Sequence, residues 1–192
     1  MVGFIELLLK SAIVDNVVFI QYLAICPFVG MTSETDKAAG MGIATSFVIV
    51  LATAVTWPVY KLVMVPLHLE FLQTLLFILV IASLVQLVEF FLKKSVPSLY
   101  KSMGVYLALI TTNCAVLGVT INCISKNYGY VQSIVYALGS ALGFLLSMLI
   151  MSAVRSRLKG ANVPKAFEGT PILYIAAGLL SLAFLGFKGL IN

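Results

Sequence analysis

The segment Tyr130–Val154 reads YVQSIVYALGSALGFLLSMLIMSAV and contains no charged side chain. An α-helix needs roughly 20 consecutive apolar residues to cross the hydrocarbon core of a bilayer, and this segment is long enough. Charge is scarce elsewhere too: 10% of the 192 residues are charged, 61% are hydrophobic, and the mean hydropathy is +1.11. A soluble domain of this size needs more charge on its surface. The composition therefore predicts a single all-α integral membrane domain.

Working outward from this segment, we find five further apolar stretches of similar length. Three of them are also uncharged, one carries only Glu89 near its end, and the first holds a few polar residues in otherwise apolar sequence. The sequence thus predicts six transmembrane helices. They lie within Phe4–Met31, Ala38–Trp57, Phe71–Leu92, Gly104–Ile121, Tyr130–Val154 and Pro171–Phe187.

The connecting segments predict the orientation, because cytoplasmic loops of membrane proteins are enriched in lysine and arginine. Eight basic residues fall in the first, third and fifth loops, and four fall on the opposite side, so both termini are expected to face outward. This placement also accounts for the net charge of +5 without a nucleic-acid partner. The start of the chain does not read as a removable signal peptide. The eight residues are Lys37, Lys93, Lys94, Lys101, Arg155, Arg157, Lys159 and Lys165; the four are Lys10, Lys61, Lys126 and Lys188.

Two segments, one in each half of the chain, resemble each other. Tyr22–Gly30 (YLAICPFVG) and Tyr106–Gly118 (YLALITTNCAVLG) both begin with Tyr-Leu-Ala and end with Cys-x-x-x-Gly. We interpret them as parts of two repeats, 1–97 and 98–192, with chance similarity between apolar helices as the alternative. Since each repeat holds three helices, the second would insert upside down relative to the first. Functional sites in such inverted repeats tend to lie near the membrane midplane.

Cys26 and Cys114 occupy equivalent positions in the two repeats, each four residues before a glycine. Pro27 and the glycines predict helices that are broken near the thiols, with free backbone N–H groups pointing at them. An iron–sulfur cluster needs four thiolates, so two per chain suggest a half-site completed by a second chain; a disulfide stays open as an alternative. Zinc is disfavoured because the single histidine, His68, falls in a loop. Cys123 has no counterpart and is interpreted as a small buried hydrophobe.

Five segments carry a resemblance to a known family: Cys26–Gly30 (CPFVG), Gly40–Thr45 (GMGIAT), Leu109–Gly118 (LITTNCAVLG), Gln132–Gly139 (QSIVYALG) and Gly178–Gly186 (GLLSLAFLG). They resemble the A subunit of the Rnf complex over nearly the whole chain, and Thr-Asn-Cys-Ala is the most specific stretch. The E subunit of the sodium-pumping NADH:quinone reductase is similar throughout and is kept as an alternative. The Cys-Pro-Phe motif favours the Rnf version.

The resemblance implies a role in electron transfer. The Rnf A subunit pairs with a homologous E-type subunit of opposite topology, and together they hold one [2Fe-2S] cluster in the bacterial cell membrane. By motif match, the ligands here would be Cys26 and Cys114. The Rnf complex passes electrons between reduced ferredoxin and NAD and exports sodium ions or protons. This chain is therefore expected to be an electron-relay subunit of a redox-driven translocase, together with the other Rnf subunits, and to perform no catalysis of its own.

Asp15 and Asn16, a polar pair within the first predicted span, are candidates for the pathway of the coupling ion. An intramembrane carboxylate is a candidate functional residue, and a solvated Asp15 near the outer interface is the alternative. Glu89 is interpreted as part of a surface ion pair with Lys93 or Lys94. Two other classes of protein fit part of the pattern. A metal-free secondary transporter also uses inverted repeats with broken helices, and a structural anchor would need neither cysteine.

Overall fold

The computed structural model of the chain describes residues 3–67, 72–95, 109–110, 112–160, 164 and 167–190. All regular elements in these ranges are helices, which confirms the predicted all-α class. In chain order they are α1 (Phe4–Leu9), the π-helix η1 (Lys10–Val14), α2 (Ile25–Met31), α3 (Thr35–Val59), the π-helix η2 (Tyr60–Met64), α4 (Val65–Leu67), α5 (Gln73–Ser95), α8 (Cys114–Ser125), α9 (Tyr130–Leu158) and α10 (Thr170–Leu190).

Four helical stretches within the described residues are long and apolar enough to cross a membrane. They match the second, third, fifth and sixth predicted spans. By length and composition, the described residues thus hold four candidate membrane-spanning helices, whereas the sequence predicts six. The four stretches are Thr35–Met64, Gln73–Phe90, Tyr130–Leu158 and Thr170–Phe187.

The first predicted span is interrupted over ten residues, Asp15–Ala24, which form no helix between η1 and α2. Tyr22 and Ala24 within it have left-handed backbone angles, with φ of 55° and 61°. The sequence predicts a break near Cys26 from Pro27 and the glycine, and the break ends two residues before Cys26, but it includes neither Pro27 nor Gly30. Pro27 lies in the first turn of α2, where a missing N–H costs no intrahelical hydrogen bond, and Gly30 lies inside the same helix.

The fourth predicted span is also interrupted immediately before its cysteine. Residues 104–108 and 111 lie outside the described residues, and residues 109–110 are helical. Thr112 and Asn113 are not helical, and α8 begins at Cys114 and continues for 12 residues. Both cysteines therefore lie at the start of a short helix that follows a break, as the sequence predicts.

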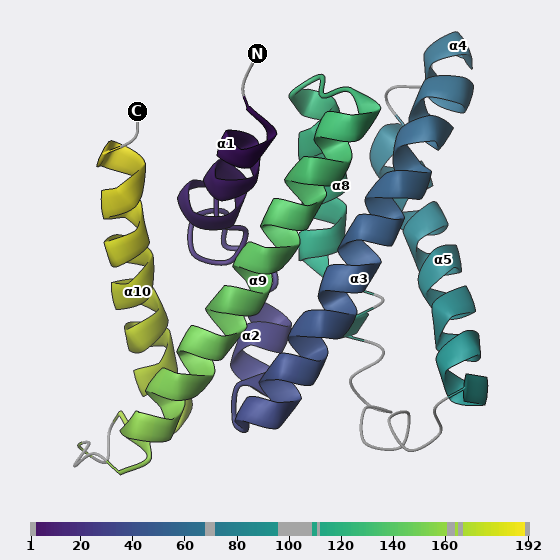
Figure 1. Cartoon of the computed structure of the whole chain (residues 1–192). Helices are drawn as coiled ribbons and strands as arrows, with labels where there is room; N and C mark the ends of the chain where they lie inside the picture. Colours follow the sequence, from purple (N-terminus) through teal and green to yellow (C-terminus); the bar gives the residue numbers. More distant parts are fainter. Residues whose placement is uncertain are drawn as a thin grey trace.

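The two short cysteine-bearing helices extend from the middle of the molecule in opposite directions (Figure 1). α8 runs toward the end of the molecule where α1 begins and α10 ends, which we call the termini end. α2 runs toward the opposite end and leads into α3 (Figure 1). The start of α1 and the end of α10 thus lie on the same side of the fold.

The core is formed by α3 and α9, which share the most extensive contact between any two described elements and cross as a central pair (Figure 1). Met41 and Ile49 of α3 and Phe144 and Met148 of α9 are fully buried. By contrast, α5 and α10 flank this pair and expose large leucine side chains. Apolar side chains on the outer face of a transmembrane helix are expected to contact lipid or another apolar subunit, because lipid tails are as apolar as leucine.

The first helical segment, formed by α1 and η1, packs against α9 at two glycines. Gly139 and Gly143 have the spacing by which transmembrane helices approach closely, small-x-x-x-small. A Cβ added to Gly143 would lie 2.5 Å from the backbone oxygen of Ala12, and one added to Gly139 would lie 2.7 Å from that of Leu8. Since the opposing atoms belong to the backbone, they cannot yield as a side chain can. This close approach fixes the end of η1, and therefore the start of the break, against α9.

Candidate metal centre and its polar surroundings

Cys114 receives a backbone hydrogen bond from the opposite break. The N–H of Ala24 donates to the Cys114 Sγ at a distance of 2.8 Å, although the two residues are 90 positions apart in the sequence. The sequence predicts a donor of this kind, namely a backbone N–H freed by a broken helix and directed at a thiol. It does not predict that the donor comes from the other half of the chain.

The position of this donor depends on unusual backbone angles and on α10. A left-handed conformation costs a non-glycine residue roughly 1–2 kcal/mol, and both Tyr22 and Ala24 adopt it. The Tyr22 hydroxyl lies 2.8 Å from Ser181 Oγ, and that Oγ donates to the carbonyl oxygen of Phe19 at 2.6 Å. One serine of α10 therefore holds two points of the break that presents Ala24 to the thiol.

Cys26 lies two residues beyond Ala24, at the second position of α2. Consecutive Cα atoms are about 3.8 Å apart, so its Cα lies at most roughly 12 Å from the Cys114 sulfur. Both cysteines are free and exposed in this chain, whereas Cys123 is free and buried, as expected for a small hydrophobic residue. The break thus brings Cys26 and Cys114 into one region and leaves both open to the outside of the fold.

The far end of α2 is held by a cation from α9. Arg155 Nη1 donates to the carbonyl oxygen of Val29 at 2.9 Å and lies 3.4 Å from Thr32 Oγ1. A positive charge near the last carbonyls of a helix is favourable because those carbonyls have no intrahelical donors. Arg155 therefore fixes the short helix that carries Cys26.

The cap of α8 supplies further polar capacity beside Cys114. Asn113 Oδ1 accepts a hydrogen bond from the N–H of Ala115 at 3.0 Å, which satisfies one of the free donors of the first turn. The Asn113 Nδ2, by contrast, is buried and has no partner among the described residues. A buried amide donor without an acceptor is costly. An anionic group at the adjacent thiol would give this donor a partner.

The non-helical segment Asp15–Ala24 contacts one face of α8 along its whole length. Three residues of α8 and its C-cap, Lys126, are involved, and they recur at every fourth position, which places them in one row on the helix. The contacts are a backbone hydrogen bond to sulfur, a leucine side chain over a glycine, an amide hydrogen bond of 2.9 Å and an ion pair of 3.3 Å. In order along α8, the pairs are Ala24 with Cys114, Leu23 with Gly118, Gln21 with Asn122 and Asp15 with Lys126.

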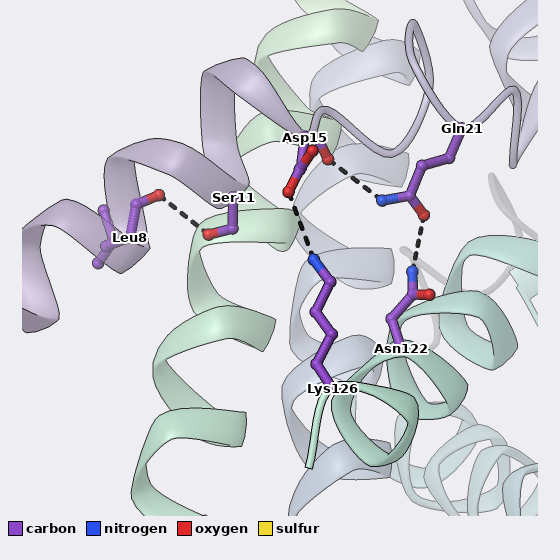
Figure 2. A network of polar contacts seen from close by, with 6 residues as sticks. All are labelled: Leu8, Ser11, Asp15, Gln21, Asn122 and Lys126. Atoms are coloured by element: carbon purple, nitrogen blue, oxygen red, sulfur yellow. Dashed lines mark hydrogen bonds and ion pairs between the residues drawn. The ribbon is translucent and has the colours of Figure 1, made fainter. Parts of the chain in front are cut away.

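Figure 2 shows the two contacts at the termini end of this row. Lys126 Nζ lies 3.3 Å from Asp15 Oδ2, and Gln21 bridges Asn122 and the backbone oxygen of Asp15. The side chains of Lys126 and Asp15 are 38% and 21% exposed. The structure therefore places Asp15 in a partly exposed ion pair; its assignment to an ion pathway stays a prediction.

Lys126 also contacts two aromatic rings. Its Nζ lies 4.8 Å from the ring centre of Tyr136 and 6.0 Å from that of Tyr128. Partial burial lowers the pKa of Lys126, but Tyr136 and Asp15 outweigh it, so the pKa lies above its ordinary value. The ammonium is therefore charged at neutral pH and attracted by groups on both sides.

Asn16 is fully buried, and its amide makes hydrogen bonds on both sides. Its Nδ2 donates to the carbonyl oxygens of Ala12 and Gly143, each at 3.1 Å. Its Oδ1 accepts from the N–H groups of Val18 and Phe19 at 2.9 and 3.3 Å, and from Ser147 Oγ at 3.0 Å. Asn16 therefore satisfies the backbone at the start of the break and ties it to α9, a role that sequence reasoning missed.

Some predicted features fall outside what the structure describes. His68 and the side chain of Lys93 lie outside the described residues, so a Glu89–Lys93 pair stays a prediction; among the described side chains, Glu89 and Lys94 form no ion pair. Within the described part of the chain, no three His, Cys, Asp or Glu side chains gather into a group that could hold a metal ion. Two cysteines in one region are the thiol ligands that the described residues offer.

The described helices define a multi-pass membrane protein with a cysteine pair beside its helix breaks. A family model described as "Rnf-Nqr subunit, membrane protein" matches residues 4–191. The chain belongs to the Rnf-Nqr family.

Similar proteins in this family carry names that specify the type of subunit. The A subunit of the ion-translocating oxidoreductase complex of Azoarcus sp. (strain BH72) is 52% identical over 186 residues, covering 97% of this chain and 96% of that protein. The A subunit of the Na(+)-translocating ferredoxin:NAD(+) oxidoreductase complex of Acetobacterium woodii is 48% identical over 186 residues, covering 97% of both. The resemblance to the Rnf A subunit is thereby confirmed, and the relatives are subunits of redox-driven translocases, as expected.

Proposed function

We propose that this chain is the A-type membrane subunit of an ion-translocating Rnf complex, in which Cys26 and Cys114 supply two of the four thiolates of a [2Fe-2S] cluster. A homologous partner subunit of opposite topology would supply the other two. The names of the relatives support the A subunit over the E subunit of the quinone reductase. Because these relatives belong to oxidoreductase complexes, their names disfavour the metal-free transporter, and the cysteine variants described below separate the electron relay from a structural anchor.

The hydrogen bond from Ala24 to the Cys114 sulfur carries this proposal. A backbone N–H at 2.8 Å stabilises negative charge on sulfur, and such donors tune the potential of iron–sulfur clusters. Asn113, the residue before Cys114, has a buried Nδ2 without a partner among the described residues, and this donor is suited to an anionic acceptor. Both thiols are exposed in the isolated chain, as ligands shared with a second subunit need to be.

The residues present fit half of such a site. Cys26 and Cys114 would hold the cluster, which would supply one-electron transfer within the membrane. Ala24 and Asn113 would stabilise the charge on the sulfur atoms. Arg155, through the end of α2, would hold Cys26 in position. The chain itself would carry electrons between cofactors on the two sides of the membrane and would make or break no covalent bond.

We further propose that the chain crosses a bacterial membrane six times, as two inverted halves, with both termini outside. The opposite directions of α2 and α8 support the inversion (Figure 1). The broken first element supports one of the two additional crossings, because α1 begins at the termini end and α2 ends at the opposite end (Figure 1); the other would contain α8. A crossing made of two short helices is tolerated where the broken backbone is covered by protein.

The test is an anaerobic electron paramagnetic resonance spectrum of the chain purified with its membrane partner and reduced by dithionite. Wild type and Cys123→Ser should give a [2Fe-2S]-type signal, because Cys123 lies outside the proposed ligand set. Cys114→Ser and Cys26→Ser should lose it while the two subunits still purify together. A well-folded wild-type pair without such a signal, or an unchanged signal in Cys114→Ser, would exclude the proposed ligands.

A further inference from the structure

Three buried hydroxyl groups of α9 form no hydrogen bond to oxygen or nitrogen of the described residues, and one of them, that of Ser133, lies against the Cys123 thiol. They belong to Ser133, Tyr136 and Ser140, which are 0%, 1% and 0% exposed. Outside α9, the hydroxyl of Thr45 and the amide nitrogen of Asn113 are also buried without a hydrogen-bond partner among the described residues. Buried polar groups in proteins are almost always paired with protein atoms or with ordered water. Three such groups in one apolar helix therefore need an explanation.

Several other buried hydroxyls among the described residues bond to their own helices. Thr32, Thr53 and Thr56 each donate to the carbonyl four residues earlier, at 2.7–2.9 Å. Serine and threonine commonly satisfy themselves in this way inside transmembrane helices. Ser133 and Ser140 have the same option and do not use it.

The unpartnered groups lie on one face of α9 together with a fourth hydroxyl. At 100° and 1.5 Å per residue, Ser133, Tyr136, Ser140 and Ser147 fall within an arc of roughly 60° and extend over about 21 Å of the helix. The glycines that contact α1 and η1 lie on one side of this arc. On the other side, Ser46 of α3 donates to the carbonyl oxygen of Ala141. The hydroxyl face therefore points into the space between α3 and the segment formed by α1 and η1.

Each end of this face leads to a polar group already described. At the termini end, Lys126 lies 4.8 Å from the Tyr136 ring and forms the partly exposed ion pair with Asp15. At the other end, Ser147 Oγ donates to Asn16 Oδ1, which anchors the break. That break ends at Ala24, the hydrogen-bond donor to Cys114. The hydroxyl face thus extends from the partly exposed ion pair at the first residue of the break to Asn16, the buried residue that anchors the same break to α9.

We propose that this face of α9 lines a hydrated pathway for the transported cation, from the Asp15–Lys126 ion pair to Asn16 and Ser147. Hydroxyl oxygens and bound waters are ligands for small hard cations such as Na⁺, and the same waters can relay a proton. Lys126 occupies the mouth as a resident cation, and an arriving cation replaces it beside the Asp15 carboxylate. The proposal rests on the proposed function for the redox reaction that drives transport.

The direct test is the accessibility of the face to water. Ser133→Cys, Ser140→Cys and the matched control Thr53→Cys are made in a Cys123→Ser background, because Cys123 lies against residue 133. The assembled complex in lipid vesicles is treated with the small cationic reagent 2-aminoethyl methanethiosulfonate, and mass spectrometry locates the modified residue. Thiols react as thiolates, which form in water and not in apolar surroundings, so residues 133 and 140 should react roughly tenfold or more faster than residue 53. Equal rates would overturn the proposal.

A second measurement separates the pathway from the electron relay. Ser133→Ala/Ser140→Ala is compared with Thr53→Val for ferredoxin:NAD electron transfer with an ionophore present, and for Na⁺ and H⁺ uptake without it. The double variant should lose severalfold in uptake of one of the two cations per electron and keep its electron-transfer rate; the control should keep both. Unchanged uptake, or an equal loss of uptake and electron transfer, would overturn the pathway. A wild-type complex without redox-driven uptake would instead refute the proposed function, and thiol labelling would still decide the pathway.

Discussion

Replacing Asn16 with alanine should loosen the break that presents Ala24 to Cys114. The amide of Asn16 takes part in five hydrogen bonds: two that it donates to Ala12 and Gly143, and three that it accepts. After truncation, Ser147 keeps its bond to the carbonyl of Gly143. The N–H groups of Val18 and Phe19 are buried and would lose the acceptor that the structure gives them.

The magnitude follows from two independent estimates. Leaving a buried donor unsatisfied costs about 1–3 kcal/mol, so two N–H groups together cost roughly 2–6 kcal/mol. Hydrogen bonds inside membrane proteins average about 0.6 kcal/mol by double-mutant cycles, so five of them contribute about 3 kcal/mol. Both estimates agree on a loss of about 3 kcal/mol, which is a large fraction of the stability of an ordinary domain.

The assay is denaturant unfolding of the purified chain in detergent, followed by circular dichroism. Gln21→Ala is the matched control, because it removes a partly buried amide from the same break and should cost about 1 kcal/mol or less. The [2Fe-2S] signal of Asn16→Ala, paired with its partner subunit, should fall along with the stability. A loss of stability no greater than that of Gln21→Ala would refute the role of Asn16 as the anchor of the break.

Three further predictions concern the packing and the charges around the break. Gly143→Ala should destabilise the chain by about 1–3 kcal/mol because the added Cβ meets the Ala12 backbone. Gly178→Ala is the control and should be neutral or stabilising because the space around it is open; equal effects of the two variants in the same unfolding assay would contradict the glycine contact. The folded-state pKa of Lys126 is raised above 10.5, so the stability that Lys126 contributes is full below that value and is lost as the pH rises through the folded pKa. The unfolding midpoint should therefore fall at alkaline pH in wild type and fall less steeply in Lys126→Met. Parallel pH curves for the two proteins would exclude this coupling. Asp15→Asn should reduce cation uptake severalfold at a stability cost of about 1 kcal/mol or less, whereas unchanged uptake would remove Asp15 from the ion pathway.

The apolar spans could be predicted because the bilayer fixes the length of an apolar helix. Ala38–Trp57, Phe71–Leu92, Tyr130–Val154 and Pro171–Phe187 each correspond to a membrane-length helix in the structure. The all-α class follows for the same reason, since a helix satisfies its own backbone in lipid. Pattern and length alone suffice for these elements.

The breaks could be predicted in kind and only partly in place. Pro27 and the nearby glycine predict a helix break near Cys26. The break does end just before α2, but it begins at Asp15 and contains neither of these residues. Its position depends on Asn16, whose partners Gly143 and Ser147 are 127 and 131 residues away. Such distant contacts leave no local signal in the sequence. The polar character of the Asp15–Asn16 pair was visible, but its structural role was not.

At the candidate site, too, the sequence identifies the cysteines but not all of the tertiary contacts around them. Repeat symmetry singled out Cys26 and Cys114, and the prediction of a backbone donor at a broken helix is confirmed in kind. The identity of that donor, Ala24, could not be read from the sequence because its left-handed conformation is held by Ser181 of α10 through other residues of the break. The row of contacts along α8 also depends on this tertiary arrangement.

The half-site is the central claim, and the iron and sulfide content of the chain tests it most directly. The chain is purified anaerobically twice, once alone and once with its homologous partner subunit, and iron and acid-labile sulfide are measured per chain. We expect one [2Fe-2S] cluster per pair of subunits and no stably bound iron in the folded chain alone, because two thiolates complete only half of the ligand set. A full cluster in the chain alone, or a folded pair without iron, would contradict the account.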